Sequence, residues 1–125
     1  MNTKPLQIIE RAVGDVTVVD LKGRLVFGDG DDTFRETLNR LIQSGRRKIL
    51  LNLDDVPYID SGGLGALVSK YISVCRRGGT LKLCRVHERA FRVLNITKLL
   101  TVFESYETEQ EALKSFEVAG PPVKV

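Results

Sequence analysis

Short apolar runs along the chain, of which residues 80–86 alternate with a period of two, predict five strands. Residues 6–11 and 16–22 flank Gly14-Asp15, a pair that favours a tight turn, so we predict a hairpin. Residues 48–53 are apolar at almost every position, which is typical of a central strand covered on both faces. The two remaining predicted strands lie within residues 80–86 and 99–103.

Apolar residues three or four positions apart predict helices between these strands. The first helix should follow a flexible, acidic connection at residues 28–32 and end near Ser44. Thr33 and Glu36 have the spacing of a capping box, although any residue from 29 to 33 is a possible cap. The predicted buried face consists of Phe34, Leu38, Leu41 and Ile42.

A second helix is expected to begin near Ser61, directly after the central strand. Asp60 and Ser61 are both good helix-capping residues, and we expect the Ser61 hydroxyl at the capping position. Gly62 and Gly63 impose no steric screen, so this hydroxyl should be accessible to another macromolecule. The predicted inward face is Leu64, Leu67, Val68, Tyr71, Val74 and Cys75, and the predicted outward face is Ala66, Lys70, Ser73 and Arg77.

Two shorter helices complete the pattern, at residues 88–94 (Phe91 and Leu94 inward) and 108–116 (Ala112, Leu113 and Phe116 inward). Because strands and helices alternate after the hairpin, the predicted fold class is α/β. We expect a mixed, mostly parallel sheet with helices packed on it, in one domain spanning residues 6–117. Residues 1–5 and 118–125 should be flexible ends.

Composition narrows the class of protein. The 125 residues are 42% hydrophobic and 28% charged, which is typical of a soluble globular domain. The net charge of +3 does not by itself argue for nucleic acid, because the basic residues are interleaved with 16 acidic ones. No signal peptide or membrane-spanning run is found, so a cytoplasmic protein without membrane insertion is expected. Cys75 and Cys84 lie in apolar patterns and are interpreted as buried, reduced thiols.

Catalytic and cofactor motifs are missing around Ser61. The glycine of a nucleophile elbow is not two residues before it, and the single histidine, His87, lies at the start of a different predicted helix. Asp29, Asp31 and Asp32 do not follow the calcium-loop pattern and are interpreted as a solvated capping cluster. We therefore expect no enzyme, no metal and no cofactor. The residues alone leave two roles for Ser61, a helix cap or a phosphorylation switch.

Residues 60–67, after an apolar strand and Asp54, resemble the signature of STAS domains, the anti-sigma factor antagonist family. Gly23-Arg24-Leu25 is similar to the Gly-x-Leu turn of that family. The apolar positions within residues 80–83 and 93–103 also resemble its later part. The resemblance spans roughly residues 6–117.

This resemblance implies a binding switch with Ser61 as the phosphorylation site. The unphosphorylated protein would bind an anti-sigma factor that is also a serine kinase using ATP, phosphorylation would break the complex, and a PP2C-type phosphatase would reset it. Gly62 stands where many members have a second serine, and Val26 where many have an acidic residue; Asp29 and Asp31 are expected to replace part of that acidic role. The N–H groups of Gly63 and Leu64 are expected to hold the phosphoryl group.

The expected partner surface surrounds Ser61. The alternative is a scaffold subunit of a signalling or lipid-transport complex that does not switch; a small enzyme or nucleotide-binding domain is a third hypothesis, for which no motif is found. No direct nucleic-acid contact is expected, and the chain should be a monomer or a weak dimer. The predicted partner-binding residues are Asp60, Gly62, Gly63, Gly65, Ser69, Ile72 and Arg76, together with Phe27, Asp29 and Asp31.

Overall fold

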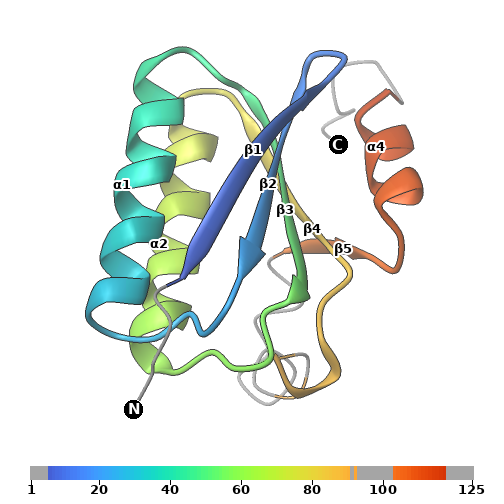
Figure 1. Cartoon of the computed structure of the whole chain (residues 1–125). Coiled ribbons are helices and arrows are strands. Elements are labelled where there is room, and N and C mark those ends of the chain that lie inside the picture. Colours follow the sequence, from blue (N-terminus) through green and yellow to red (C-terminus); the bar gives the residue numbers. More distant parts are fainter. Residues whose placement is uncertain (1–5, 91, 93–102, 118–125) are drawn as a thin grey trace, which may run out of the picture.

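A five-stranded mixed sheet forms the centre of the protein (Figure 1). The computed structural model describes residues 6–90, 92 and 103–117. The order in the sheet is β1-β2-β3-β4-β5; β1 and β2 pair antiparallel, and every later neighbour pairs parallel. The predicted hairpin and mostly parallel sheet are confirmed. The strands are β1 (Gln7–Val13), β2 (Val16–Lys22), β3 (Lys48–Asp55), β4 (Thr80–Cys84) and β5 (Glu104–Tyr106).

Helices cover both faces of this sheet. α1 (Asp29–Gln43) and α2 (Ser61–Arg76) lie side by side on one face, and the shorter α4 (Glu109–Glu117) packs on the other (Figure 1). α1 and α2 are the crossovers of two successive parallel β-α-β connections. Such connections share one hand, which places both helices on the same side of the sheet.

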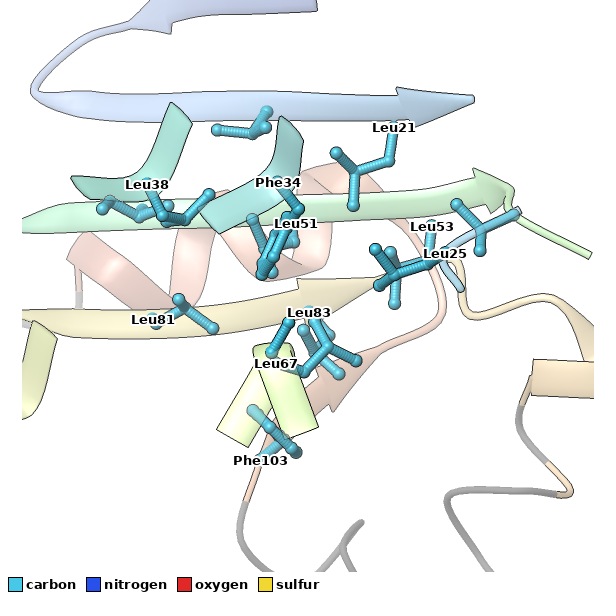
Figure 2. Close-up of a cluster of buried hydrophobic side chains, with 14 of the residues drawn as sticks. Leu21, Leu25, Phe34, Leu38, Leu51, Leu53, Leu67, Leu81, Leu83 and Phe103 are labelled. Carbon is cyan, nitrogen blue, oxygen red and sulfur yellow. The ribbon is translucent and has the colours of Figure 1, made fainter. Parts of the chain in front are cut away.

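The larger apolar core fills the space between the sheet and helices α1 and α2 (Figure 2). β3 contributes Leu51 and Leu53 to this core, whereas its Leu50 faces the smaller core under α4. β3 is therefore covered on both faces, as its continuous apolar sequence predicted. The predicted inward residues of α1 are all buried: Phe34, Leu38, Leu41 and Ile42.

A smaller core on the second face holds α4, through Ala112 and Phe116. Lys82 of β4 is buried with its ammonium 4.6 Å from the centre of the Phe116 ring. Its Nζ donates to Ser115 Oγ at 2.8 Å and pairs with Glu104 at 3.1 Å. This cation is satisfied by the elements that it joins, so it fastens α4 to the sheet.

The start of α1 differs from the prediction. The helix begins at Asp29, so most of residues 28–32 is its first turn and not a flexible connection. Thr33 is not the cap, because the carboxylate of Asp31 accepts a hydrogen bond from the Gly28 N–H at 2.9 Å and closes the turn from inside the helix. The acidic residue at the third helical position stabilises this end, as in the second half of a capping box.

The predicted faces of α2 also need correction. Ala66 and Lys70, expected to point outward, are buried, because α2 packs against α1 as well as against the sheet. Lys70 Nζ donates to Asn39 Oδ1 of α1 at 2.7 Å. Cys75, expected inward, is exposed, whereas Cys84 is buried; both are free thiols.

The C-terminal part agrees in order and differs in bounds. β4 ends at Cys84, and the last strand follows the buried Phe103 instead of containing it. Residues 88–90 and 92 are helical as predicted. The calls on Phe91, Leu94, residues 99–102 and the two flexible ends fall outside the described residues. Among the described helices, none has the length and apolarity needed to cross a membrane.

Candidate functional site

Asp60, and not Ser61, caps α2. Its Oδ1 accepts a hydrogen bond from the Gly63 N–H at 2.9 Å, and both carboxylate oxygens lie 3.1 Å from the Phe27 nitrogen. Partial burial raises the pKa of Asp60, but the backbone N–H donors of Gly63, Phe27 and Gly62 outweigh it and hold the pKa below its usual range. The carboxylate thus joins the start of α2 to the segment after β2.

Ser61 is the first residue of α2 and is exposed. Within residues 6–90, 92 and 103–117, no group hydrogen-bonds its hydroxyl. Because Asp60 performs the capping that the sequence assigned to Ser61, the hydroxyl has no structural task in the described fold. The prediction that it is accessible at the start of the helix is confirmed, and the prediction that it is the cap is wrong.

Gly62 and Gly63 permit close packing under the site. A Cβ on Gly62 would lie 2.6 Å from Phe27 Cβ, and one on Gly63 would lie 2.0 Å from the carbonyl oxygen of Leu25. Any side chain here would push the segment after β2 away from α2. Gly63 is also buried, so its predicted place on a partner surface is wrong; Gly62 is half-buried beneath Phe27.

The connection that follows β2 is fixed against the connection that follows β3. Leu25 N–H donates to the Tyr58 carbonyl at 3.0 Å, Leu25 pairs with Ile59 in a short parallel bridge, and Asp60 N–H donates to the Leu25 carbonyl at 3.3 Å. Leu25 is fully buried, so its neighbours emerge on the surface in defined positions. Phe27 emerges next to the start of α2 with 79% of its surface exposed.

Two large apolar side chains, Phe27 and Tyr58, are exposed on the connections that lead to the start of α2, and a third, Ile72, is exposed about three turns further along the helix. Phe27, Tyr58 and Ile72 are exposed, and the guanidinium of Arg24 stacks over the Tyr58 ring at 5.3 Å. We call the exposed residues here the Ser61 surface. It also includes predicted partner residues on α2, of which Ser69 is half-buried and the others are exposed. The Ser61 surface comprises Ser61, Phe27, Tyr58, Gly65, Ser69, Ile72 and Arg76.

The sequence prediction missed Tyr58 and overestimated Asp31. Tyr58 lies two residues before the capping Asp60, and an exposed aromatic so close to the motif was a usable signal. Asp31 is buried and its Oδ1 is bonded to Gly28, so it cannot offer that carboxylate to a partner. Asp29 is the first residue of α1.

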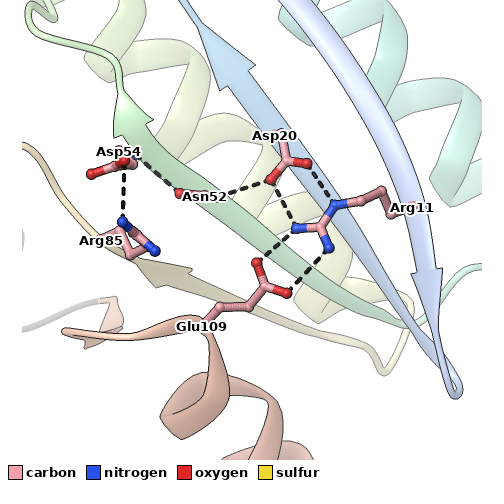
Figure 3. Close-up of polar contacts among 6 residues, drawn as sticks. All are labelled: Arg11, Asp20, Asn52, Asp54, Arg85 and Glu109. Atoms are coloured by element: carbon pink, nitrogen blue, oxygen red, sulfur yellow. Dashed lines mark hydrogen bonds and ion pairs between the residues drawn. The ribbon is translucent and has the colours of Figure 1, made fainter.

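A second polar region lies on the face of the sheet that carries α4 (Figure 3). Arg11 binds Asp20 through its Nε at 2.6 Å and Glu109 of α4 through Nη2 at 2.7 Å; we call these three residues the Arg11 network. Beside it lies an open groove of about 390 Å³. Arg85 at its edge pairs with Asp54 at 3.3 Å. Arg11 and Arg85 therefore already have carboxylate partners within the fold, and neither is a free cation in this groove.

The fold, together with the motif at residues 60–67 that forms the start of α2, is that of a STAS domain. The STAS family model matches residues 7–112, and the chain belongs to that family. The TM1081 homologue of Thermotoga neapolitana is 45% identical over 87 residues, 70% of this chain and 72% of that protein. The anti-sigma F factor antagonist of Paenibacillus polymyxa is 30% identical over 84% of this chain and 90% of its own length.

Solved structures agree with this assignment. The crystal structure of TM1081 from Thermotoga maritima has a TM-score of 0.83 and 29% identity, covering 88% of this chain and 94% of that one. Bacillus SpoIIAA in its phosphorylated form has a TM-score of 0.70 at 20% identity, covering 88% of this chain and 99% of that one, and shares the fold.

Proposed function

We propose that this protein is an anti-sigma factor antagonist controlled by phosphorylation of Ser61. The unphosphorylated form binds an anti-sigma factor that is also a serine kinase, through the Ser61 surface. The observation that carries the proposal is an exposed serine hydroxyl, without a structural task, beside the exposed ring of Phe27. The names of the relatives support the regulatory class, and the phosphorylated form of SpoIIAA supports a phosphoryl switch on this fold.

The proposed reaction takes place on Ser61 but is catalysed by the partner. The serine Oγ attacks the γ-phosphorus of ATP, the new Oγ–P bond forms as the bond to the β-phosphate oxygen breaks, ADP leaves, and the hydroxyl proton passes to a base of the kinase. A PP2C-type phosphatase reverses the modification by hydrolysis. This chain acts by binding, and we assign no catalytic role to its residues.

Physical chemistry favours a switch at this position. A phosphoryl group adds about −1.5 to −2 charges. Ser61 is exposed at the first residue of α2, where the helix dipole favours this charge and the Asp60 carboxylate opposes it, so α2 should keep its stability within about 1 kcal/mol. A partner packed over Ser61 would instead have to bury the dianion, which costs roughly several kcal/mol without a matching cation. Phosphorylation therefore changes affinity far more than it changes stability.

The scaffold alternative rests on one departure from the family pattern. By the family resemblance, Val26 stands where many members carry an acidic residue, and the buried Asp31 cannot replace that group. A partner that needs that acidic group would bind this chain weakly. In that case the Ser61 surface would serve a constant interface in a larger complex.

The two functions are separated by titrating the purified chain with candidate serine kinases from the same genome. We expect a single phosphoryl adduct in the mass spectrum that is absent from Ser61→Ala, and partner affinity at least about 30-fold weaker for Ser61→Asp. Phe27→Ala should also weaken binding about tenfold or more, as truncation of an aromatic hot spot does.

A matched control is Ser105→Asp, which places the same charge on an exposed serine of β5. It should bind like the wild type. Unchanged affinity of Ser61→Asp, with no kinase able to modify the protein, would overturn the switch and leave the scaffold function.

A further inference from the structure

The N–H groups expected to hold a phosphoryl group on Ser61 are already occupied. Gly63 N–H donates to the carboxylate of Asp60 at 2.9 Å, and Leu64 N–H donates to the Asp60 carbonyl at 2.8 Å. For these two groups to receive the phosphoryl group, as predicted, both of these bonds would have to break. Moreover, the anionic Asp60 carboxylate stands at the helix start and repels a second anion there. With these two N–H groups occupied, a phosphoryl group on Ser61 gains most from a cation nearby.

Arg35 of α1 lies within reach of the same face of α2. Its Nη2 is 4.0 Å from the position that a Cβ would occupy on Gly65. Gly65 follows Ser61 by four residues, so the two positions are neighbours on the helix surface, about 5–6 Å apart at Cβ. Depending on the side-chain rotamer, a phosphoryl group on Ser61 points either toward the Arg35 guanidinium or away from it. Because residue 65 is a glycine, no side chain stands between them.

The charge of Arg35 is only loosely compensated within the described part of the chain. Its carboxylate partner there is Asp31, at 3.8 Å, and the other oxygen of that carboxylate accepts from Gly28. Lys70 lies next to it, buried and bonded to an amide oxygen; burial and the charge of Arg35 both lower the pKa of Lys70. The contact between α1 and α2 therefore holds two cations, Arg35 and Lys70, of which Arg35 lies next to Gly65.

We propose that Arg35 binds the phosphoryl group of phosphorylated Ser61 and draws it along α2 over Gly65. This inference rests on the proposed function, because it concerns the phosphorylated form. A guanidinium binds phosphate oxygens with parallel, charge-assisted hydrogen bonds. The phosphoryl group then lies over Gly65, within the Ser61 surface, where it blocks a partner by volume as well as by charge.

Arg24 is the rival cation and provides the matched control. It lies on the connection after β2, and its guanidinium stacks on the Tyr58 ring. Both arginines are exposed or half-exposed, so their replacement by glutamine should leave the fold intact. Equal melting temperatures of the unphosphorylated variants check this.

The test is a ³¹P NMR titration of protein that carries phosphoserine at position 61, introduced during translation. Asp60 and Asp31 raise the second pKa of the phosphate, while Arg35, Lys70 and Arg24 lower it. We expect Arg35→Gln to raise this pKa by about 0.5 at low salt and Arg35→Lys to have a smaller effect. Arg24→Gln should raise it by clearly less than Arg35→Gln, because the Arg24 guanidinium is held over the Tyr58 ring.

Superposed curves for wild type and Arg35→Gln would overturn the inference, and so would a larger effect of Arg24→Gln. The titration can be measured whether or not a kinase modifies Ser61, because the phosphoserine is introduced during translation. If no kinase modifies Ser61 but Arg35→Gln shifts the titration, the switch fails and the pairing stands. If Ser61→Asp abolishes partner binding while the titrations superpose, only the pairing fails.

Discussion

The Arg11 network and the Ser61 surface are both rich in polar groups, yet they use them in opposite ways. In the Arg11 network the guanidinium bridges two carboxylates, one on the hairpin and one on α4, and its charge is compensated within the fold. At the Ser61 surface the carboxylate of Asp60 is turned toward backbone N–H groups, while the Ser61 hydroxyl and the Phe27 ring remain exposed.

The difference separates polar groups that build the fold from groups left for recognition. Arg11 and Glu109 are 98 residues apart in sequence, so their pair positions α4 on the sheet. Asp60 similarly joins Phe27 to α2 across 33 residues. Beside Asp60, however, most of the Phe27 side chain is exposed, and the Ser61 hydroxyl has no partner in the described fold. Substitutions in the two regions should therefore affect different quantities.

The largest effect on stability is expected for Gly63→Ala. The new Cβ would lie 2.0 Å from the Leu25 carbonyl oxygen, which is backbone and cannot rotate away. We expect the free energy of unfolding to fall by about 3 kcal/mol, as in overpacked cores, in urea unfolding followed by circular dichroism.

Gly65→Ala is the matched control, two residues along the same helix. Its Cβ would meet no atom closer than 4.0 Å, and alanine favours the helix by roughly 0.5–1 kcal/mol over glycine. Gly63→Ala with wild-type stability would show that Leu25 does not pack closely on α2.

A smaller loss is expected for Asp60→Ala, by about 1–2 kcal/mol at neutral pH, because the cap of α2 and the bond to Phe27 both disappear. The pKa of Asp60 is lower in the folded protein than its ordinary value of 3.8. The ionised carboxylate therefore contributes its full stabilisation above pH 3.8, and this stabilisation disappears as the pH falls through the folded pKa. Unfolding curves of wild type and Asp60→Ala should therefore converge in acid. A constant difference from pH 7 to pH 2 would contradict the role of the ionised carboxylate.

Much of the fold follows from patterns within single elements. The apolar run at residues 48–53 was sufficient to place β3 at the centre, and the spacing of Phe34, Leu38 and Leu41 identified the buried face of α1. The errors arose where two elements meet. Lys70 was predicted to point outward because the apolar spacing within α2 identifies one buried face. It does not show that α1 covers a second face of the same helix.

The candidate site was predictable in its position and not in its contacts. The motif at residues 60–67 pointed to Ser61, but the role of Asp60 depends on Phe27, which local spacing does not bring near. The sequence predicted that Gly62 and Gly63 leave Ser61 unscreened. In the fold these two glycines pack closely against the segment that follows β2. Such close approaches are set by tertiary packing, which a single sequence does not display.

The smallest effect is expected for Arg11→Gln, a loss of about 1 kcal/mol, because the pairs are partly exposed and partly screened. The hydrogen bond from Arg11 is the main cause that lowers the pKa of Asp20, so the wild-type advantage should be complete above pH 3.8 and vanish as the pH falls through the lower folded value. Urea unfolding at pH 7 and pH 2.5, at low and high salt, measures it. Lys48→Gln, which removes an exposed pair with Asp15, is the control and should change stability less.

Partner affinity should stay at the wild-type level in Arg11→Gln while it falls in Phe27→Ala. An Arg11→Gln protein of unchanged stability that has lost its partner would reverse the assignment and place recognition on the α4 face.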